Sequence, residues 1–310
     1  MLPARIALFA VLALVSSLAS AATCYVNSGA AGGNGTSWAT AYIDLQSALV
    51  NPVCEGVWVA RGTYKPTPAT DRTISFNIRP GVYVYGGFAG TEATLEARLL
   101  PANPTILSGD IGVAGDASDN SYHVVVMDGT TGAGPVSPGT LLSDLTISDG
   151  NGGTFGANHD RGGGLFCNGS GAGHQCSPTL QNLIFKNNIA LFGGALYNAG
   201  DSGGNASPEL DNVFLHDNTA TFSGGAVYNY GALSGTSNPL INGATFSANS
   251  AGNGGAIFDD GTQGTSSPTI RNVTFYANTA QLGGAIMDAG ESSGHANPVL
   301  RYVTFNHNQA

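Results

Sequence analysis

Two groups of aspartates have residue types and spacings that could support chemistry. Asp110, Asp116 and Asp119 lie in the segment SGDIGVAGDASDN, where carboxylate and carbonyl oxygens could wrap a calcium ion. The segment lacks the regular alternation and the closing Glu of a helix–loop–helix calcium site, so a solvated acidic loop is the competing interpretation. If calcium binds there, the melting temperature should change across a chelator titration.

The second group of carboxylates follows two GGAI segments. Asp259 and Asp260 follow the first segment, and Asp288 lies at the corresponding place after the next. Stacked carboxylates at this place could bind calcium or act as the acid pair of a glycosidase. Asn198 and Asn229 occupy the same place in earlier segments, which favours a polar turn over a catalytic site.

Basic and histidine side chains offer fewer candidates. Arg271 and Arg301 lie at nearly the same place in two consecutive segments, either as a basic pair facing outward or as two solvated exterior side chains. His159, Asp160 and Arg161 cluster in a long insertion without a nucleophile, which favours an ordinary exposed loop. Neither group predicts a catalytic centre by itself.

The elements that must position these residues recur about every thirty residues. Prolines mark the repeat at intervals of 30, 31, 29 and 30 residues: Pro178, Pro208, Pro239, Pro268 and Pro298. Seven positions later lies a large apolar residue: Phe185, Leu215, Phe246, Phe275 or Phe305. Ten positions later lies an asparagine: Asn188, Asn218, Asn249, Asn278 or Asn308. Such self-similarity is typical of stacked repeat architectures.

Each repeat contains two or three short strands separated by turns. In SPTIRNVTF, Val273 and Phe275 alternate with polar neighbours, whereas Ile270 is one step out of phase. One repeat cannot bury its own apolar face, but repeats stacked about 4.8 Å apart place each residue on its copy in the next. The pattern therefore predicts an interior phenylalanine column and an asparagine ladder in which each amide donates to one neighbour and accepts from another.

Paired glycines precede the second strand of four repeats. A nucleotide-binding glycine loop would occur once, between a strand and a helix, with a Lys-Ser/Thr or an acidic partner. Repetition without a following helix favours a different role, namely a bend with positive φ or a contact too close for a β-carbon. The pairs are Gly193-Gly194, Gly224-Gly225, Gly254-Gly255 and Gly283-Gly284.

Residues 1–21 have the pattern of a secretory signal peptide. Arg5 precedes the apolar stretch IALFAVLALVSSLAS, and Ala19, Ser20 and Ala21 form a small-x-small cleavage pattern. No later stretch approaches the roughly 18 apolar residues of a membrane-spanning helix. We therefore expect an exported protein, extracellular or at a bacterial cell surface, and not an integral helical membrane protein.

Composition and cysteines are consistent with export. The net charge of −10 argues against nucleic acid or anionic membranes as partners. Four cysteines fit an oxidising compartment: Cys167 and Cys176 are close enough to close a short loop, and Cys24 with Cys54 would hold the N-terminal region. Metal ligation is the alternative, although no Cys-x-x-Cys spacing supports it.

Residues 22–64 predict an N-terminal cap and the first coils. In ATAYIDLQSALV we expect an amphipathic helix that follows Thr36 and Ser37 and has Leu45, Ala48 and Leu49 on its apolar face. The segment VWVARGTY then resumes the strand pattern. The helix would cover the unpaired strand edges and core at the open end of the stack.

At this point a family resemblance is evident. The helix and VWVARGTY resemble the N-terminal cap of right-handed parallel β-helix proteins of the pectin-lyase-like superfamily. The PTIRNVTFYANTAQLGGAI repeats, RPGVYVYGGFAGTE and NSYHVV resemble the polymorphic-outer-membrane-protein-like members that bacteria export. The resemblance implies an all-β, right-handed parallel β-helix over residues 65–310, with about 30 residues per coil and regular repeats from about residue 177. This fold carries lyases, hydrolases, adhesins and passive surface proteins, so it does not specify an activity.

We expect a non-catalytic protein of adhesin-like or envelope-structural type that binds extracellular glycans or cell-surface components along one face. The only cofactor considered is Ca²⁺ at the acidic loop. The alternative is a polysaccharide lyase or glycoside hydrolase, which would need clustered acids and often a basic residue that the regular repeats hardly supply. The repeat pattern stops at Ala310 before its paired glycines, so we expect either a longer natural protein or pairing of this edge with another chain.

Overall fold

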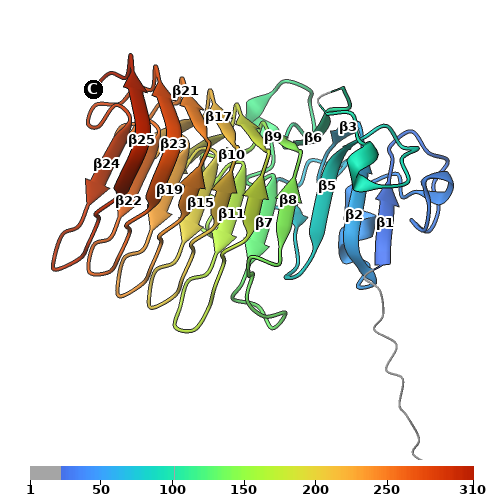
Figure 1. Ribbon diagram of the computed structural model, residues 1–310, viewed down its shortest axis with the longest axis horizontal. Coiled ribbons are helices and arrows are strands. Elements are labelled where there is room, and N and C mark those ends of the chain that lie inside the picture. Colours follow the sequence, from blue (N-terminus) through green and yellow to red (C-terminus); the bar gives the residue numbers. More distant parts are fainter. Residues whose placement is uncertain (1–21, 101) are drawn as a thin grey trace, which may run out of the picture.

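The computed structural model describes residues 22–100 and 102–310, so the expected signal peptide lies outside the described residues. Strands lie side by side along the length of the molecule in three sheets (Figure 1). The strand pairs are parallel throughout the described chain, from the first pair to the last. The protein is therefore all-β with long parallel sheets and little helix, which is consistent with a parallel β-helix.

The largest sheet, here the long sheet, has 15 strands in two rows. One row contains β1 (Ala22–Val26), β2 (Cys54–Ala60), β5 (Tyr83–Phe88), β8 (Leu141–Ser143), β12 (Thr179–Gln181), β16 (Glu209–Asp211) and β20 (Leu240–Asn242). The other contains β3 (Gly62–Tyr64), β6 (Thr105–Ser108), β9 (Thr146–Ser148), β13 (Ile184–Lys186), β17 (Phe214–His216) and β21 (Thr245–Ser247). Two longer strands, β23 (Thr269–Tyr276) and β25 (Val299–Asn306), join the rows.

Two smaller sheets complete the architecture. The seven-stranded sheet contains β4 (Phe76–Asn77), β7 (Val125–Asp128), β11 (Leu165–Asn168), β15 (Leu196–Ala199), β19 (Val227–Tyr230), β22 (Ile257–Asp260) and β24 (Ile286–Ala289). The three-stranded sheet contains β10 (Asn151–Gly152), β14 (Ile189–Phe192) and β18 (Thr219–Ser223). The helical segments are α1 (Leu45–Val50) and the 3₁₀ turns η1 (Trp38–Thr40), η2 (Leu95–Ala97) and η3 (Ala117–Asp119).

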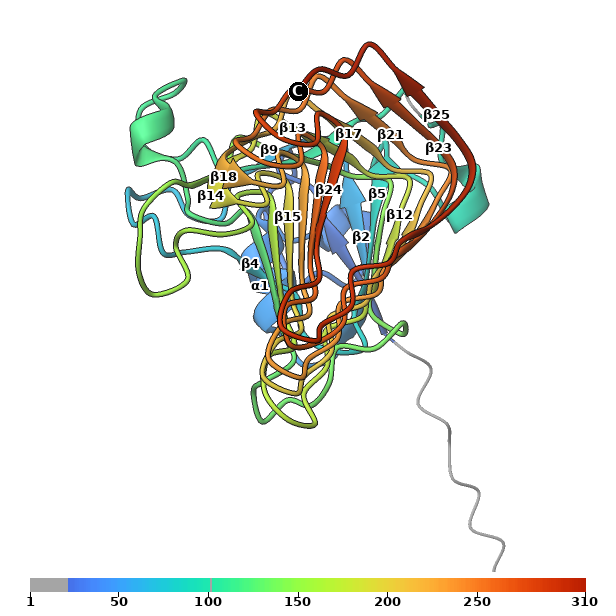
Figure 2. The same ribbon diagram turned by 90° about the vertical axis from the view of Figure 1, so that its left-hand side faces the viewer.

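Successive repeats lie almost directly over one another, as the view along the molecule shows (Figure 2). The register places Phe185 beside Leu215, and Leu215 beside Phe246. The rings of Phe246 and Phe275 stack with centroids 4.9 Å apart, and those of Phe275 and Phe305 with centroids 5.0 Å apart. The equivalent large apolar residues thus form the column that the repeat predicts.

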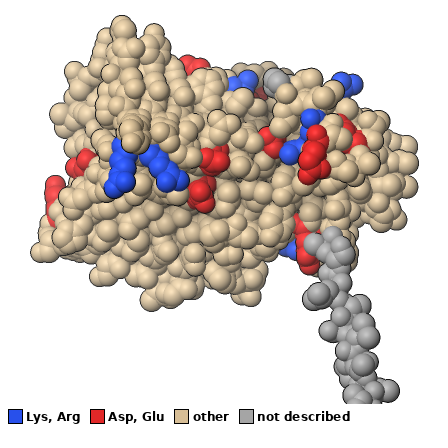
Figure 3. Space-filling view, viewed as in Figure 1, with Lys and Arg blue, Asp and Glu red and all other residues tan. Residues whose placement is uncertain are grey.

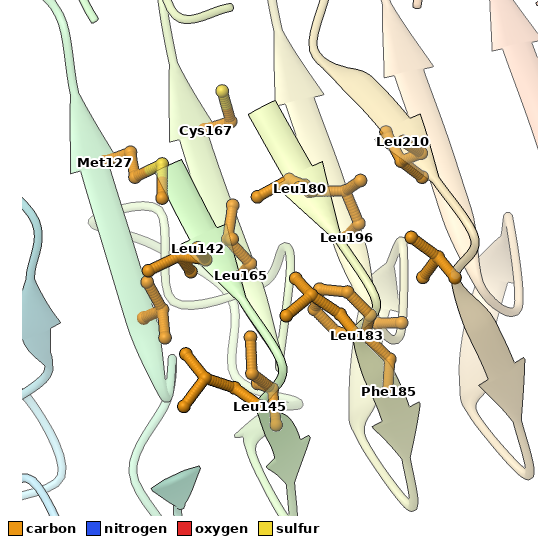
Figure 4. Close-up of a cluster of buried hydrophobic side chains, with 14 of the residues drawn as sticks. Met127, Leu142, Leu145, Leu165, Cys167, Leu180, Leu183, Phe185, Leu196 and Leu210 are labelled. Carbon is orange, nitrogen blue, oxygen red and sulfur yellow. The ribbon is translucent and has the colours of Figure 1, made fainter. Parts of the chain in front are cut away.

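Successive residues of a strand face opposite sides of a sheet, and the inward-facing side of the strands supplies the main apolar core. On the face seen in Figure 3, charged side chains occur in a few small groups, and most of the surface carries neither sign. The interior close-up shows Leu142, Leu180 and Leu210 from one row of strands packed toward Leu165 and Leu196 from the seven-stranded sheet (Figure 4). One continuous core therefore runs through the stack.

Left-handed backbone positions explain why Ile270 is out of phase with Val273 and Phe275. Asn272 has φ 55°, so the strand turns a corner there and both flanking apolar residues point inward. The same corner recurs at φ values of 53° to 65° in Asn182, Asn212 and Gly243. A period-two count fails across such a corner because the bend changes which side of the chain faces the core.

The asparagine ladder forms inside the stack. The amide nitrogen of Asn188 donates to the side-chain oxygen of Asn218 at 3.0 Å, and Asn218 donates in the same way to Asn249 at 3.0 Å. The series continues to Asn278 at 2.9 Å and to Asn308 at 2.8 Å. Each of these amides also donates to a backbone carbonyl, so the buried polar groups are satisfied.

The paired glycines have both of the expected roles. Gly193 has φ 62°, in the left-handed region where a β-carbon is unfavourable. A β-carbon on Gly194 would lie 2.4 Å from the carbonyl oxygen of Gly225 in the next repeat. The first glycine therefore provides a bend, and the second allows close contact between coils.

The N-terminal helix is shorter than the sequence pattern indicates. Ser37 caps the 3₁₀ turn η1, and α1 begins at Leu45 after Asp44, whose carboxylate accepts the amide hydrogen of Ser47 at 2.8 Å. The expected helix start at Thr36 and Ser37 is wrong because a second capping aspartate follows. The apolar face is as expected: Leu45, Ala48 and Leu49 are buried.

The cysteines form two disulfides, Cys24–Cys54 and Cys167–Cys176, with Cα atoms 5.4 Å and 5.6 Å apart. All four side chains are buried in the core. The first bond joins neighbouring parallel strands β1 and β2, and the second closes the short loop after β11. These disulfides indicate folding in an oxidising environment.

Candidate functional site

The acidic loop does not gather its carboxylates into a metal site. Asp110 lies 3.6 Å from the Lys65 ammonium, and its other oxygen accepts a backbone amide of the same loop. Asp116 and Asp119 likewise accept loop amides at 2.9 Å and 2.7 Å. Within residues 22–100 and 102–310, no cluster of three His, Cys, Asp or Glu side chains is placed to hold a metal ion. These aspartates instead stabilise the turns of their own loop.

Asp259 belongs to the interior and not to a polar turn. It lies within β22, its side chain is fully buried, and its register neighbours are Asn229 and Asp288. Asn198 donates to Asn229 at 2.8 Å, and Asn229 donates to Asp259 at 2.7 Å, which makes a second interior ladder. The polar-turn interpretation is wrong because the strand continues through Asp260. Because its side chain is fully buried, Asp259 does not present a carboxylate to an external polysaccharide.

The electrostatics of this second ladder are unusual. Burial raises the pKa of Asp259 well above its ordinary value, and the neighbouring Asp288 carboxyl raises it further. Burial also raises the pKa of Asp288. The Oδ2 atom of Asp259 has no hydrogen-bond partner among the described residues. The pair therefore favours a protonated carboxyl inside the stack.

The outer face of the seven-stranded sheet carries a column of large side chains. The register aligns Phe166, Tyr197, Tyr228, Phe258 and Met287. Neighbouring ring centroids lie 6.0, 5.0 and 5.1 Å apart along the four aromatic members. The sequence analysis did not predict this column. Its signal was the aromatic residue that recurs directly before the Asn or Asp in GGALYN, GGAVYN and GGAIFD.

A cleft of about 230 Å³ lies over this column. We call it the aromatic cleft, and it is lined by Arg161, Phe192, Tyr197, Tyr228, Tyr230 and Asp260. In Figure 2, β14 and β18 and the projecting loop of residues 153–161 lie on the same side as the outer face of the seven-stranded sheet. Phe192 of β14 meets Tyr228 edge to face at 5.5 Å, and Phe222 of β18 extends this aromatic wall at 5.3 Å from Phe192.

Of the His159–Asp160–Arg161 segment, Arg161 lines the cleft, and the segment is not an ordinary exposed loop. Asp160 is only 8% exposed, and its carboxylate pairs with the Arg161 guanidinium at 3.0 Å. The guanidinium lies 5.0 Å from the ring centroid of Tyr197, a cation–π contact. His159 stacks on Tyr122 at 4.0 Å, which anchors the segment. Sequence spacing could not reveal these contacts because Arg161 and Tyr197 lie in different coils.

The tyrosines of the cleft are neutral hydrogen-bonding groups. Burial raises the pKa of Tyr197 and of Tyr228 well above the ordinary value, and burial also raises the pKa of Tyr230. The Tyr228 hydroxyl donates to Asp260 Oδ2 at 2.9 Å, and the Thr262 amide donates to Asp260 Oδ1 at 3.1 Å. The cleft therefore combines apolar ring surface, phenolic hydroxyls and a fixed carboxylate.

Arg271 and Arg301 lie elsewhere, on the outer face of the long sheet. They are register neighbours in β23 and β25, and both are exposed. Arg271 donates to the Asn242 side chain at 3.2 Å. This arrangement agrees with two solvated exterior side chains and brings neither guanidinium to the aromatic cleft.

Compared with protein-family models, curated proteins and solved structures, the chain matches none. In the described part of the chain, no helix has the length and hydrophobicity needed to cross a membrane.

Proposed function

We propose that this is an exported, non-catalytic protein that binds extracellular glycans in the aromatic cleft. The proposal includes a right-handed solenoid of the pectin-lyase-like type, capped by α1, and an adhesin-like or envelope role at a bacterial surface. Its supports are the signal-peptide pattern, the two disulfides and the parallel sheets. The observation that carries it is the aromatic cleft itself.

The chemistry of the cleft matches that of a sugar. A pyranose has apolar C–H faces and a rim of hydroxyl groups, so it needs both ring surface and hydrogen-bonding partners. Phe192 and Tyr230 are half-buried, so part of each ring remains open to the cleft. Tyrosine hydroxyls donate and accept hydrogen bonds, and the Asp260 carboxylate accepts them. Aromatic walls with a few convergent polar groups are the usual composition of small-ligand sites.

A panel of immobilised neutral, acidic and amino-sugar glycans tests the proposal. We expect wild-type protein to bind at least one glycan class and the variants Tyr230→Ala and Phe192→Ala to lose about tenfold or more in affinity, since each removes ring contact area. Tyr276→Ala is the matched control because Tyr276 is 46% exposed on the long sheet, away from the cleft. Absence of binding to the whole panel, or equal loss in the control, would refute the proposal.

The alternative is cleavage of a polysaccharide, favoured by the presence of Asp260 beside the tyrosines. Glycoside hydrolysis ordinarily uses two carboxyl groups that flank the scissile bond, and Asp260 is the one carboxylate among the residues that line the cleft. Binding without turnover is therefore the preferred function. Release of reducing ends or unsaturated sugars by the wild type, abolished by Asp260→Asn, would establish the alternative.

A further inference from the structure

The aromatic cleft contains acidic charge that the protein does not compensate. Asp160 is paired with Arg161 at 3.0 Å. Asp260 lines the cleft and is a register neighbour of Tyr230, and Asp201 follows Ala199, the other register neighbour of Tyr230, by two residues. Burial raises the pKa of Tyr230, the carboxylates of Asp201 and Asp260 raise it further, and the Arg161 guanidinium lowers it. Among the described residues, no salt bridge involves either carboxylate. Asp260 in the cleft lining and Asp201 beside it thus have no salt-bridge partner, and Arg161, whose charge also acts on Asp201, is paired with Asp160.

The hydrogen bonds of these two carboxylates keep them in place as acceptors. Asp201 accepts hydrogen bonds from the hydroxyls of Ser170 and Ser202. Asp260 accepts one from the Tyr228 hydroxyl at 2.9 Å. These neutral donors orient the carboxylates but leave their charge unbalanced.

The same cleft already holds one cation against an aromatic ring. The Arg161 guanidinium lies over Tyr197, whereas the cation–π contacts of the described residues include none over Tyr230 or Phe192. A cation between an aromatic face and a carboxylate gains from both the ring quadrupole and the opposite charge. The open part of the cleft therefore suits a positively charged ligand group.

We propose that the aromatic cleft selects glycans containing basic amino sugars, such as N-deacetylated hexosamine units, a specificity that rests on the glycan-binding function proposed above. The sugar ring packs against Phe192 and Tyr230, and its ammonium group supplies the positive charge that Asp201 and Asp260 lack. An N-acetylated unit has no charge to offer. A uronic acid would add a third negative charge to the two that are already unpaired.

Isothermal titration calorimetry with two matched probes tests this specificity. The probes are a β-linked glucosamine hexamer and its fully N-acetylated counterpart, at about pH 6, below the usual pKa of an amine. We expect the basic hexamer to bind wild type at least about tenfold more tightly, and the Asp201→Asn/Asp260→Asn variant to bind both probes about equally. Tyr230→Ala should weaken both probes because it removes the stacking surface.

A control separates site recognition from general attraction of a polycation to an acidic protein. Asp211→Asn removes one charge from β16 of the long sheet and should leave the tenfold preference unchanged. Equal or tighter binding of the acetylated hexamer, or a preference that persists in the double variant, overturns the specificity while leaving glycan binding intact. Failure of every glycan on the panel would instead remove the underlying function. Melting curves of each variant verify that the fold is retained.

Discussion

The buried carboxyl of Asp259 should contribute more to stability in acid than at neutral pH. Other groups oppose this contribution, since hydrogen bonds from Thr73 lower the pKa of Asp71 and burial lowers the pKa of His123 to about 4, so the effect is measured as a difference between wild type and a variant. Burial raises the pKa of Asp259 in the folded state above its ordinary value, so between those two values the unfolded chain releases a proton that the folded chain keeps. The contribution to stability is fully present below the ordinary pKa and is lost as the pH rises through the folded-state pKa. Within that window, the contribution of Asp259 to the free energy of unfolding should fall by about 1.4 kcal/mol per pH unit.

The substitution Asp259→Asn should remove the loss of stability that ionisation of Asp259 causes as the pH rises. The new amide keeps an oxygen for Asn229, which now donates to Asp259 at 2.7 Å, and places an amino group where Oδ2 has no partner among the described residues. That amino group can donate to Asp288, the register neighbour. Because an unsatisfied buried polar atom costs about 1 to 3 kcal/mol, we expect the variant to be about 2 kcal/mol more stable at about pH 7.

Thermal unfolding followed by far-ultraviolet circular dichroism provides the measurement. A gain of about 2 kcal/mol corresponds to a melting temperature roughly 4 to 8 °C higher, and the gain should shrink toward zero at about pH 4. Glu209→Gln is a suitable control because Glu209 is exposed on β16 and takes part in none of the salt bridges of the described residues. A variant less stable than wild type at both pH values, or a stability difference between variant and wild type that does not change across this range, would refute the reasoning.

Two further predictions concern the stack itself. Asn218→Ala should lower the free energy of unfolding by about 3 kcal/mol, because it leaves several buried ladder groups without hydrogen-bond partners. The control Asn306→Ala, at an exposed position, should change the free energy of unfolding by less than about 0.5 kcal/mol. Urea unfolding measures both variants. Gly194→Ala should destabilise by about 2 kcal/mol or more because its β-carbon would lie 2.4 Å from a carbonyl oxygen of the next repeat. Gly132→Ala, where a β-carbon meets no atom within 4 Å, should be nearly neutral, and equal melting temperatures for the two glycine variants would contradict this account.

Much of the fold could be predicted because the repeat is a direct record of stacking. Equivalent residues such as Phe246 and Phe275 lie in contact one coil apart, so a spacing of about thirty residues in the sequence corresponds to adjacency in space. The sequence pattern predicts too early a start for α1, because two capping residues, Ser37 and Asp44, precede the apolar face. Only Asp44 caps an α-helix, whereas Ser37 caps a 3₁₀ turn. Local signals of similar strength cannot decide between such alternatives.

The candidate site was harder to predict than the fold. Arg161 comes from an insertion, Phe192 from the three-stranded sheet, and Tyr230 and Asp260 from two successive coils. No periodicity links an insertion to a repeat position, so the cleft has no signature in the spacing. The sequence shows an aromatic residue before each polar position, but it does not show that this residue lies on the outer face of the seven-stranded sheet.

The sequence by itself determined the stacked parallel strands, the ladders and the need for glycine between coils, because these depend on like residues recurring at one interval. Only the tertiary structure decided that Asp259 faces the interior and Asp260 the aromatic cleft. Adjacent residues of a strand face opposite sides, and the left-handed corners of each coil set which side is which. That choice places one carboxyl inside the stack, where its protonation affects stability, and its neighbour at the cleft that we propose binds glycans.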